Sequence, residues 1–118
     1  MLDRIRRSIR EAFGYRYIDI LDDQPSILKL AYGPTTTTFD RGNAMVLQNG
    51  RLVAMADLIE KIELHQPQSQ DGPVNWFVTV HVRGARKVEV GRITDSTDAS
   101  LIAARISAIV GKPVVLGR

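Results

Sequence analysis

Apolar and polar residues alternate along most of this 118-residue chain, from Tyr15 to Ile93, and this period of two limits the fold more than any other feature. It is typical of β-strands with one buried face, because successive side chains of a strand point to opposite sides. The longest example is VNWFVTVHVRG, in which one face carries Val74, Trp76, Val78, Val80 and Val82. The strands follow one another without helical spacing between them, so we expect them to pair antiparallel.

Turn signals separate these strands. Asn49-Gly50 stands between AMVLQ and RLVAM, and this dipeptide favours the positive φ angles of a two-residue type I′ hairpin. GARK, residues 84–87, is the expected turn of a second hairpin, and HQPQSQDGP, residues 65–73, has the prolines and glycine of a loop. The segments between the turns predict roughly seven short strands.

Two other segments have helical spacing. MLDRIRRSIREAF has apolar residues at positions 2, 5, 9, 12 and 13, arginines on the opposite side and Gly14 as a stop. This pattern predicts a basic amphipathic helix over residues 1–14. TDSTDASLIAARISAIVGKP begins with capping residues and ends with Gly111 and Pro113. Its apolar stripe at Ile102, Ile106, Ile109 and Val110 predicts a second helix over residues 96–110.

The resulting fold class is α+β. We expect one domain, residues 15–113, because 118 residues are the usual size of a single compact unit. Its strands form an antiparallel meander, its second helix covers the sheet, and residues 114–118 form a tail. Since the longest apolar run is far shorter than a membrane span needs, and the N-terminus is charged, we expect a cytoplasmic protein.

The positive charge is confined to the N-terminal segment. Of the 16 basic and 13 acidic residues, five and two fall before residue 18, which leaves 11 of each in the remainder. The body of the protein is therefore neutral, and nucleic-acid binding is not expected. Two interpretations of the first helix stay open. It docks on the domain's own core, or it lies on an anionic membrane or in a partner's groove, with contacts from Arg4, Arg6, Arg7 and Arg10.

The sequence contains no recognisable reactive constellation. It has no cysteine, which excludes disulfides, thiolate metal sites and thiol catalysis, and its two histidines, His65 and His81, lack metal-ligand spacing. Asp57, Glu60 and Glu63 alternate with core residues, as a solvated face does, on a strand or a short helical turn. We therefore expect no enzymatic activity, no metal and no cofactor.

The order of these elements resembles that of bacterial pleckstrin-homology-like (PH-like) domains. The matching pieces cover about residues 26–111: Phe39-Asp40-Arg41, Asn49-Gly50, Asp57-Leu58-Ile59 with Ile62, Val74 to Arg83, Lys87 to Ile93, and Ser100 to Val110. The resemblance implies two near-orthogonal antiparallel sheets in a PH-like barrel, closed at one end by the C-terminal helix. It also implies a binding or assembly module. The connection that carries lysines and arginines in lipid-binding relatives corresponds to the acidic Asp22-Asp23-Gln24-Pro25 here, which argues against phosphoinositide recognition.

The expected function is a non-enzymatic protein-interaction or assembly module with an unidentified protein partner or a second copy of itself. The alternative is a peripheral membrane module attached through the basic N-terminal helix. A second candidate contact is the basic turn formed by Arg83, Arg86 and Lys87, with Arg92 as a further candidate member. It is an ordinary solvated hairpin in one interpretation and a contact for an anion or an acidic partner in the other.

Overall fold

The computed structural model of the chain describes residues 17–66 and 75–117. The predicted helix 1–14, with Arg4, Arg6, Arg7 and Arg10, lies outside these residues. So does most of the predicted loop 65–73.

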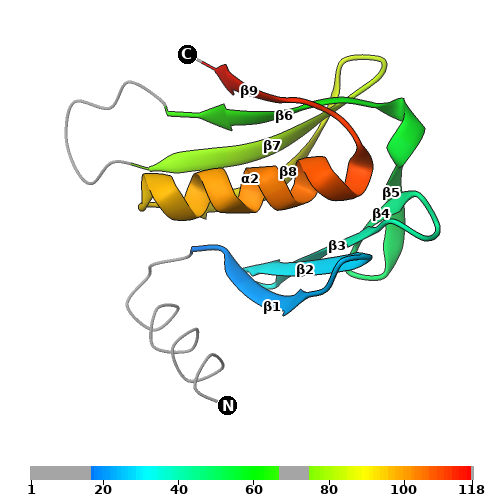
Figure 1. Cartoon of the computed structure of the whole chain (residues 1–118), viewed down its shortest axis with the longest axis horizontal. Helices are drawn as coiled ribbons and strands as arrows, with labels where there is room; N and C mark the ends of the chain where they lie inside the picture. Colours follow the sequence, from blue (N-terminus) through cyan, green and yellow to red (C-terminus); the bar gives the residue numbers. More distant parts are fainter. Residues whose placement is uncertain (1–16, 67–74, 118) are drawn as a thin grey trace.

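The described strands form two sheets (Figure 1). The first sheet is antiparallel and follows chain order: β1 (Asp19–Asp23), β2 (Ile27–Tyr32), β3 (Thr35–Asp40), β4 (Met45–Gln48) and β5 (Arg51–Met55). A short 3₁₀ helix, η1 (Ala56–Leu58), leads into the second sheet. That sheet has the order β8-β7-β6-β9, with bounds β6 (Ile59–His65), β7 (Trp76–Val82), β8 (Arg86–Ile93) and β9 (Val114–Gly117).

The helix α2 (Ser96–Val110) has the bounds that its capping signals predict. The Asp95 side chain accepts a hydrogen bond from the Asp98 backbone N–H at 3.0 Å, which satisfies one of the free donors at the helix start. Gly111 ends the helix in the left-handed conformation, with φ at 72°, and its N–H donates to the Ser107 carbonyl at 2.8 Å.

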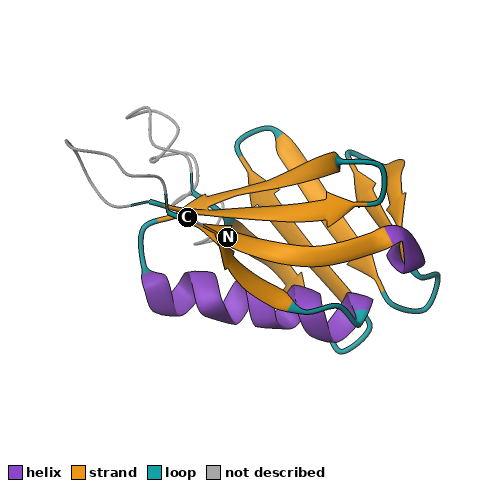
Figure 2. Cartoon of the chain, turned by 90° about the horizontal axis from the view of Figure 1, so that it is seen from above, coloured by secondary structure: helices purple, strands orange, loops and turns teal. Residues whose placement is uncertain are grey.

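The core lies where α2 and the two sheets meet. Figure 1 shows α2 running between β6–β8 and β1–β3, and Figure 2 shows it along one side of the strands. The apolar stripe of α2 is buried, and Ile106 in its middle is fully enclosed. The sheets contribute the inward-facing residues that the alternation predicts, among them Phe39, Val46, Ile62, Val78 and Val80.

The two sheets approach each other closely at Gly91 of β8. Its φ angle is 146°, and a Cβ atom added there would lie 2.7 Å from both Ile18 Cγ1 and Tyr32 Cγ. The backbone N–H of Ile18 donates to the Arg92 carbonyl at 2.9 Å beside this contact. A glycine is therefore required for the start of the first sheet to rest on β8.

The predicted α+β class and antiparallel pairing are confirmed, but three details of the predicted fold were wrong. The two expected sheets are present, but the described part of the chain holds nine strands rather than about seven, and the sheets do not close into a barrel. The predicted tail 114–118 contains β9, which pairs parallel to β6. The free edge of β6 makes this strand possible, because it offers pairing groups to Val114–Gly117 and to the Pro113 carbonyl, which accepts from Ile62 N–H at 2.9 Å. In the residues described, no helix is long and apolar enough to cross a membrane.

Candidate functional site

An open groove of about 620 Å³ lies between β1 and α2. One wall is the start of the first sheet and the other is the N-terminal half of the helix. The buried side chains of Leu28 and Ile102 form its floor. α2 packs against the second sheet and against β2 and β3 of the first, and the groove lies beside these contacts, where α2 faces β1. We call this feature the β1–α2 groove.

Two large aliphatic side chains line the groove and remain in contact with solvent. Ile20 on β1 is 45% exposed and Leu101 on α2 is 60% exposed. They stand on opposite walls, above the buried floor. Single exposed apolar residues are common on protein surfaces, but here two of them share one hollow, so both of its walls expose apolar surface.

The polar lining of the groove is mostly acidic. Four carboxylates, those of Asp19, Asp23, Asp95 and Asp98, stand against one guanidinium, that of Arg105, which gives a formal charge of −3. Because residues 18–118 are neutral in sum, this is a local concentration of negative charge that the rest of those residues balance.

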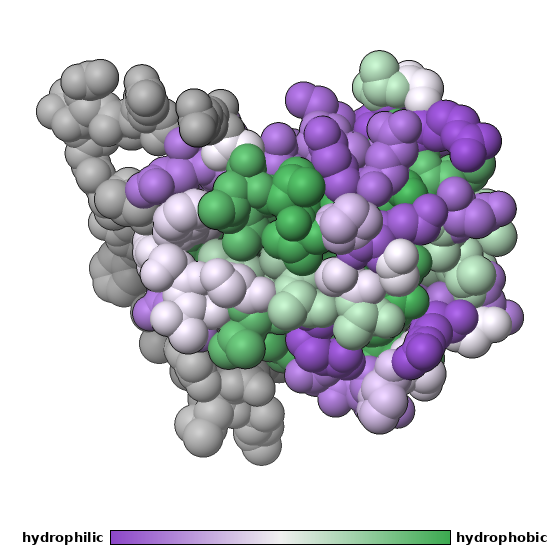
Figure 3. Space-filling model, turned by 45° about the horizontal axis from the view of Figure 1, so that its top comes forward, coloured by the Kyte–Doolittle hydropathy of each residue, from purple (hydrophilic) through white to green (hydrophobic). Residues whose placement is uncertain are grey.

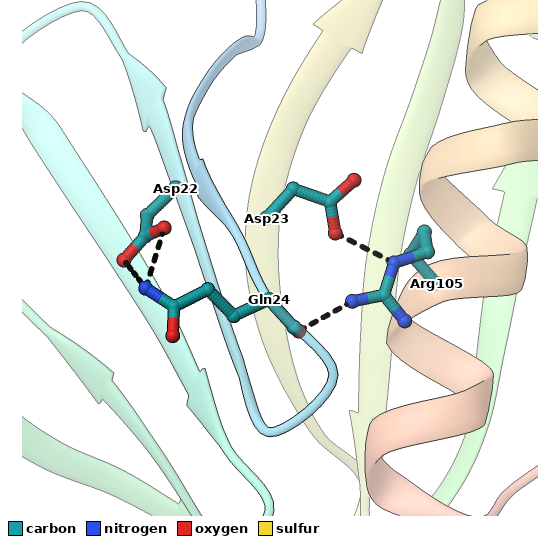
Figure 4. Close-up of polar contacts among 4 residues, drawn as sticks. All are labelled: Asp22, Asp23, Gln24 and Arg105. Carbon is teal, nitrogen blue, oxygen red and sulfur yellow. Dashed lines mark hydrogen bonds and ion pairs between the residues drawn. The ribbon is translucent and has the colours of Figure 1, made fainter.

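Arg105 connects the two walls at one end (Figure 4). Its Nε donates to Asp23 Oδ1 at 2.7 Å and its Nη2 donates to the Gln24 carbonyl at 2.7 Å. The neighbouring Gln24 side chain donates in turn to the Asp22 carboxylate at 3.1 Å. This network fixes the β1–β2 turn against α2, so the width of the groove is set by hydrogen bonds as well as by packing. The acidic connection 22–25 thus has a structural role.

The basic turn lies elsewhere, at the β7–β8 connection, and its members differ. Arg83, Arg86 and Lys87 are all exposed, and Arg86 Nη2 in addition donates to the Val53 carbonyl of β5 at 2.9 Å, which connects the two sheets. Arg92 does not join them, because it lies near the other end of β8 with its guanidinium 5.8 Å from the Tyr17 ring centroid. The sequence alone does not distinguish the positions of Arg86 and Arg92, because β8 has an arginine near each of its ends.

The remaining polar candidates occupy structural positions. Asp57 lies on η1, while Glu60 and Glu63 lie on β6. Glu63 Oε1 stands 3.3 Å from His81 Nε2 of β7, an ion-pair distance without hydrogen-bond alignment. Across residues 17–66 and 75–117, no three His, Asp or Glu side chains gather closely enough to hold a metal ion.

Asp40, at the end of β3, organises the turn that follows. Its carboxylate accepts hydrogen bonds from Asn43 Nδ2 at 2.8 Å and from Asn43 N–H at 3.1 Å. The Asn43 side chain, followed by its backbone N–H, lowers the pKa of Asp40 from the ordinary 3.8, because these bonds favour the charged form. The hydrogen bonds between Asp40 and Asn43 therefore stabilise the turn that follows β3.

The groove itself was missed by sequence reasoning. Two features of the sequence bear on the groove. Leu101 lies beside the apolar stripe of α2, and Ile20 continues the alternation that begins at Ile18. Both look like ordinary core or surface residues until the fold brings them to one hollow.

Comparisons of the chain with protein-family models, with curated proteins and with solved structures find no match. The PH-like resemblance therefore stays a prediction.

Proposed function

We propose that this chain is a non-enzymatic protein-interaction module whose β1–α2 groove receives a basic, amphipathic segment of a partner polypeptide. The observation that carries the proposal is the combination of Ile20 and Leu101 with an excess of carboxylates in one hollow. Helical segments bind such grooves through an apolar face, and complementary charge sets their orientation and speeds their association. The PH-like resemblance supports the same class of function, because it implies a binding module.

A binding measurement tests the groove directly. A fluorescent 14-residue peptide with leucines at helical spacing and arginines on the other face is titrated into the full chain, and anisotropy is recorded. We expect saturable binding that weakens at least tenfold in the double variant Asp98→Lys with Leu101→Glu. The loss of one buried leucine contact alone costs about 1.5–3 kcal/mol, and about 1.4 kcal/mol is a factor of ten.

The matched control is Leu116→Glu. Leu116 is 74% exposed on β9 and lies outside the groove lining. The control is expected to bind the peptide as the parent does. Equal affinity of the parent and the groove variant would contradict the proposal.

Assembly with a second copy is a related candidate, favoured by the outer edge of β9. Edge strands present unpaired backbone groups that can accept another strand. β9 carries the exposed side chains Val114 and Leu116, and Figure 3, in which the side bearing β9 is turned forward, shows an apolar patch among hydrophilic side chains. Light scattering after size exclusion at several concentrations tests it, and a constant monomer mass would remove self-association.

The second candidate function is attachment to a membrane surface through residues 1–14, favoured by the confinement of the net +3 charge to residues 1–17. Arginines on one side of an amphipathic helix attract anionic lipid. Co-sedimentation with anionic and with neutral vesicles tests it, and equal recovery with both would exclude the electrostatic mode.

A further inference from the structure

We propose that, in the absence of a partner, the β1–α2 groove is occupied by the chain's own N-terminal segment, residues 1–14. This inference rests on the proposed function, since it names the resting occupant of the same groove. It makes the segment an internal competitor of any partner that binds there.

The first support is the place where the described chain begins. Tyr17 and Ile18 line the groove, so the polypeptide that precedes them starts at its wall. Residues 15 and 16 separate the segment from Tyr17, and the three steps of chain from residue 14 to Tyr17 span at most about 11 Å. A tether this short keeps the segment near the groove at an effective concentration in the millimolar range.

The second support is the match of size and apolar surface. The groove borders α2 from Asp98 to Arg105, about 10 Å along the helix axis, so a segment of two helical turns is long enough to fill it. Apolar positions 2, 5, 9 and 13 of the N-terminal segment form one stripe, which can cover Ile20 and Leu101. Such a short helix is marginal by itself in water, so it requires a surface of this kind.

The third support is charge. Residues 1–14 contain four arginines against Asp3 and Glu11, a formal charge of +2, and the groove lining carries −3. Arg105 already pairs with Asp23 at one end of the groove. Asp98 is exposed and lies in the first turn of α2. The arginines of the segment can therefore approach the part of the groove around Asp98, whereas Arg105 pairs with Asp23 at the other end.

The chain has no cysteine, so a single introduced thiol reports on the groove. In the full chain carrying Leu101→Cys, the rate of reaction with a maleimide measures how often the groove is open. We expect the further substitutions Ile5→Glu and Ile9→Glu, which break the apolar stripe, to accelerate this reaction at least about tenfold, since millimolar tethering favours the closed state.

The matched reporter is Leu116→Cys on β9, whose labelling is expected to be the same with and without the two N-terminal substitutions. Circular dichroism melting of each variant verifies that the fold is retained. Equal labelling of the Leu101→Cys reporter in both backgrounds would overturn the inference.

Two other outcomes would also overturn it and would identify a different occupant. Protection of the Leu101→Cys thiol that disappears on dilution would assign the groove to the segment of a second copy. A fully reactive thiol in a protein that sediments with anionic vesicles would assign the segment to the membrane. The peptide titration described above distinguishes the two proposals, because peptide binding that depends on Leu101 can persist whether or not residues 1–14 protect it.

Discussion

Replacing Gly91 with alanine is the most informative single perturbation of the fold. Gly91 lies where β8 passes under the first sheet, and an added Cβ would meet Ile18 Cγ1 at 2.7 Å, Tyr32 Cγ at 2.7 Å and Tyr32 Cδ1 at 2.8 Å. Atoms at these separations overlap. Either Tyr32 or the chain segment that contains Ile18, just before β1, must therefore move, and Ile18 also lines the β1–α2 groove.

Two costs combine in Gly91→Ala. The φ angle of 146° is one that a residue with a side chain rarely adopts, and such strain costs about 1–3 kcal/mol. Overpacking of a close contact costs about 1–3 kcal/mol more. The free energy of unfolding should fall by about 2–6 kcal/mol, a large part of the roughly 5–15 kcal/mol that a domain has.

Urea denaturation followed by the fluorescence of Trp76, the chain's one tryptophan, measures this loss. We expect a lower midpoint with an unchanged dependence on urea concentration. Gly84→Ala is the control, because Gly84 also has a positive φ, 87°, but its added Cβ would have no neighbour within 4 Å. The difference between the two variants isolates the overlap with Ile18 and Tyr32. If they agree within about 0.5 kcal/mol, the packing argument is refuted.

Three further substitutions have defined expectations. Asp95→Ala removes the N-cap of α2 and should lower the free energy of unfolding by about 1 kcal/mol in a thermal melt, and no change would mean that the cap does not form. Asn43→Ala should raise the pKa of Asp40 towards 3.8, measured by NMR titration of its carboxyl. The folded-state pKa of Asp40 is depressed, so its contribution to stability is present above pH 3.8 and is lost as the pH falls through the folded value. The variant should lose that contribution, and an unchanged pKa would contradict the hydrogen-bond assignment. Arg86→Gln should destabilise by about 0.5–1.5 kcal/mol through its lost bond to β5, while Lys87→Gln, its exposed neighbour, should not, and equal effects would show that the bond adds nothing.

Local signals predicted the parts of the fold that depend on neighbouring residues. Asn49 and Gly50 have φ angles of 51° and 81°, as a two-residue hairpin requires, and Gln48 pairs with Arg51 across the turn. The second helix follows in the same way from Asp95 at its start and Gly111 at its end. In both cases the determining contacts lie within a few residues of each other.

The features that sequence reasoning missed depend on contacts between distant segments. β9 forms because the edge of β6 is free, and the short stretch VVLG has too few residues to show alternation. The β1–α2 groove depends on the position of α2 relative to β1, which no periodicity encodes. The prediction for residues 1–14 concerns a segment outside the described residues, so it stays a prediction.

The parallel pairing of β9 with β6 has a consequence for the order of folding. Ile62 and Val114 are 52 positions apart, and all of β7, β8 and α2 lie between them. Closing so long a loop is entropically unfavourable until the intervening hairpin and helix have already shortened it. β9 should therefore join its sheet after β7, β8 and α2 are in place. By the same reasoning it should be the first strand to open in the native protein, so that its amide protons exchange with solvent faster than those of β6 and β7.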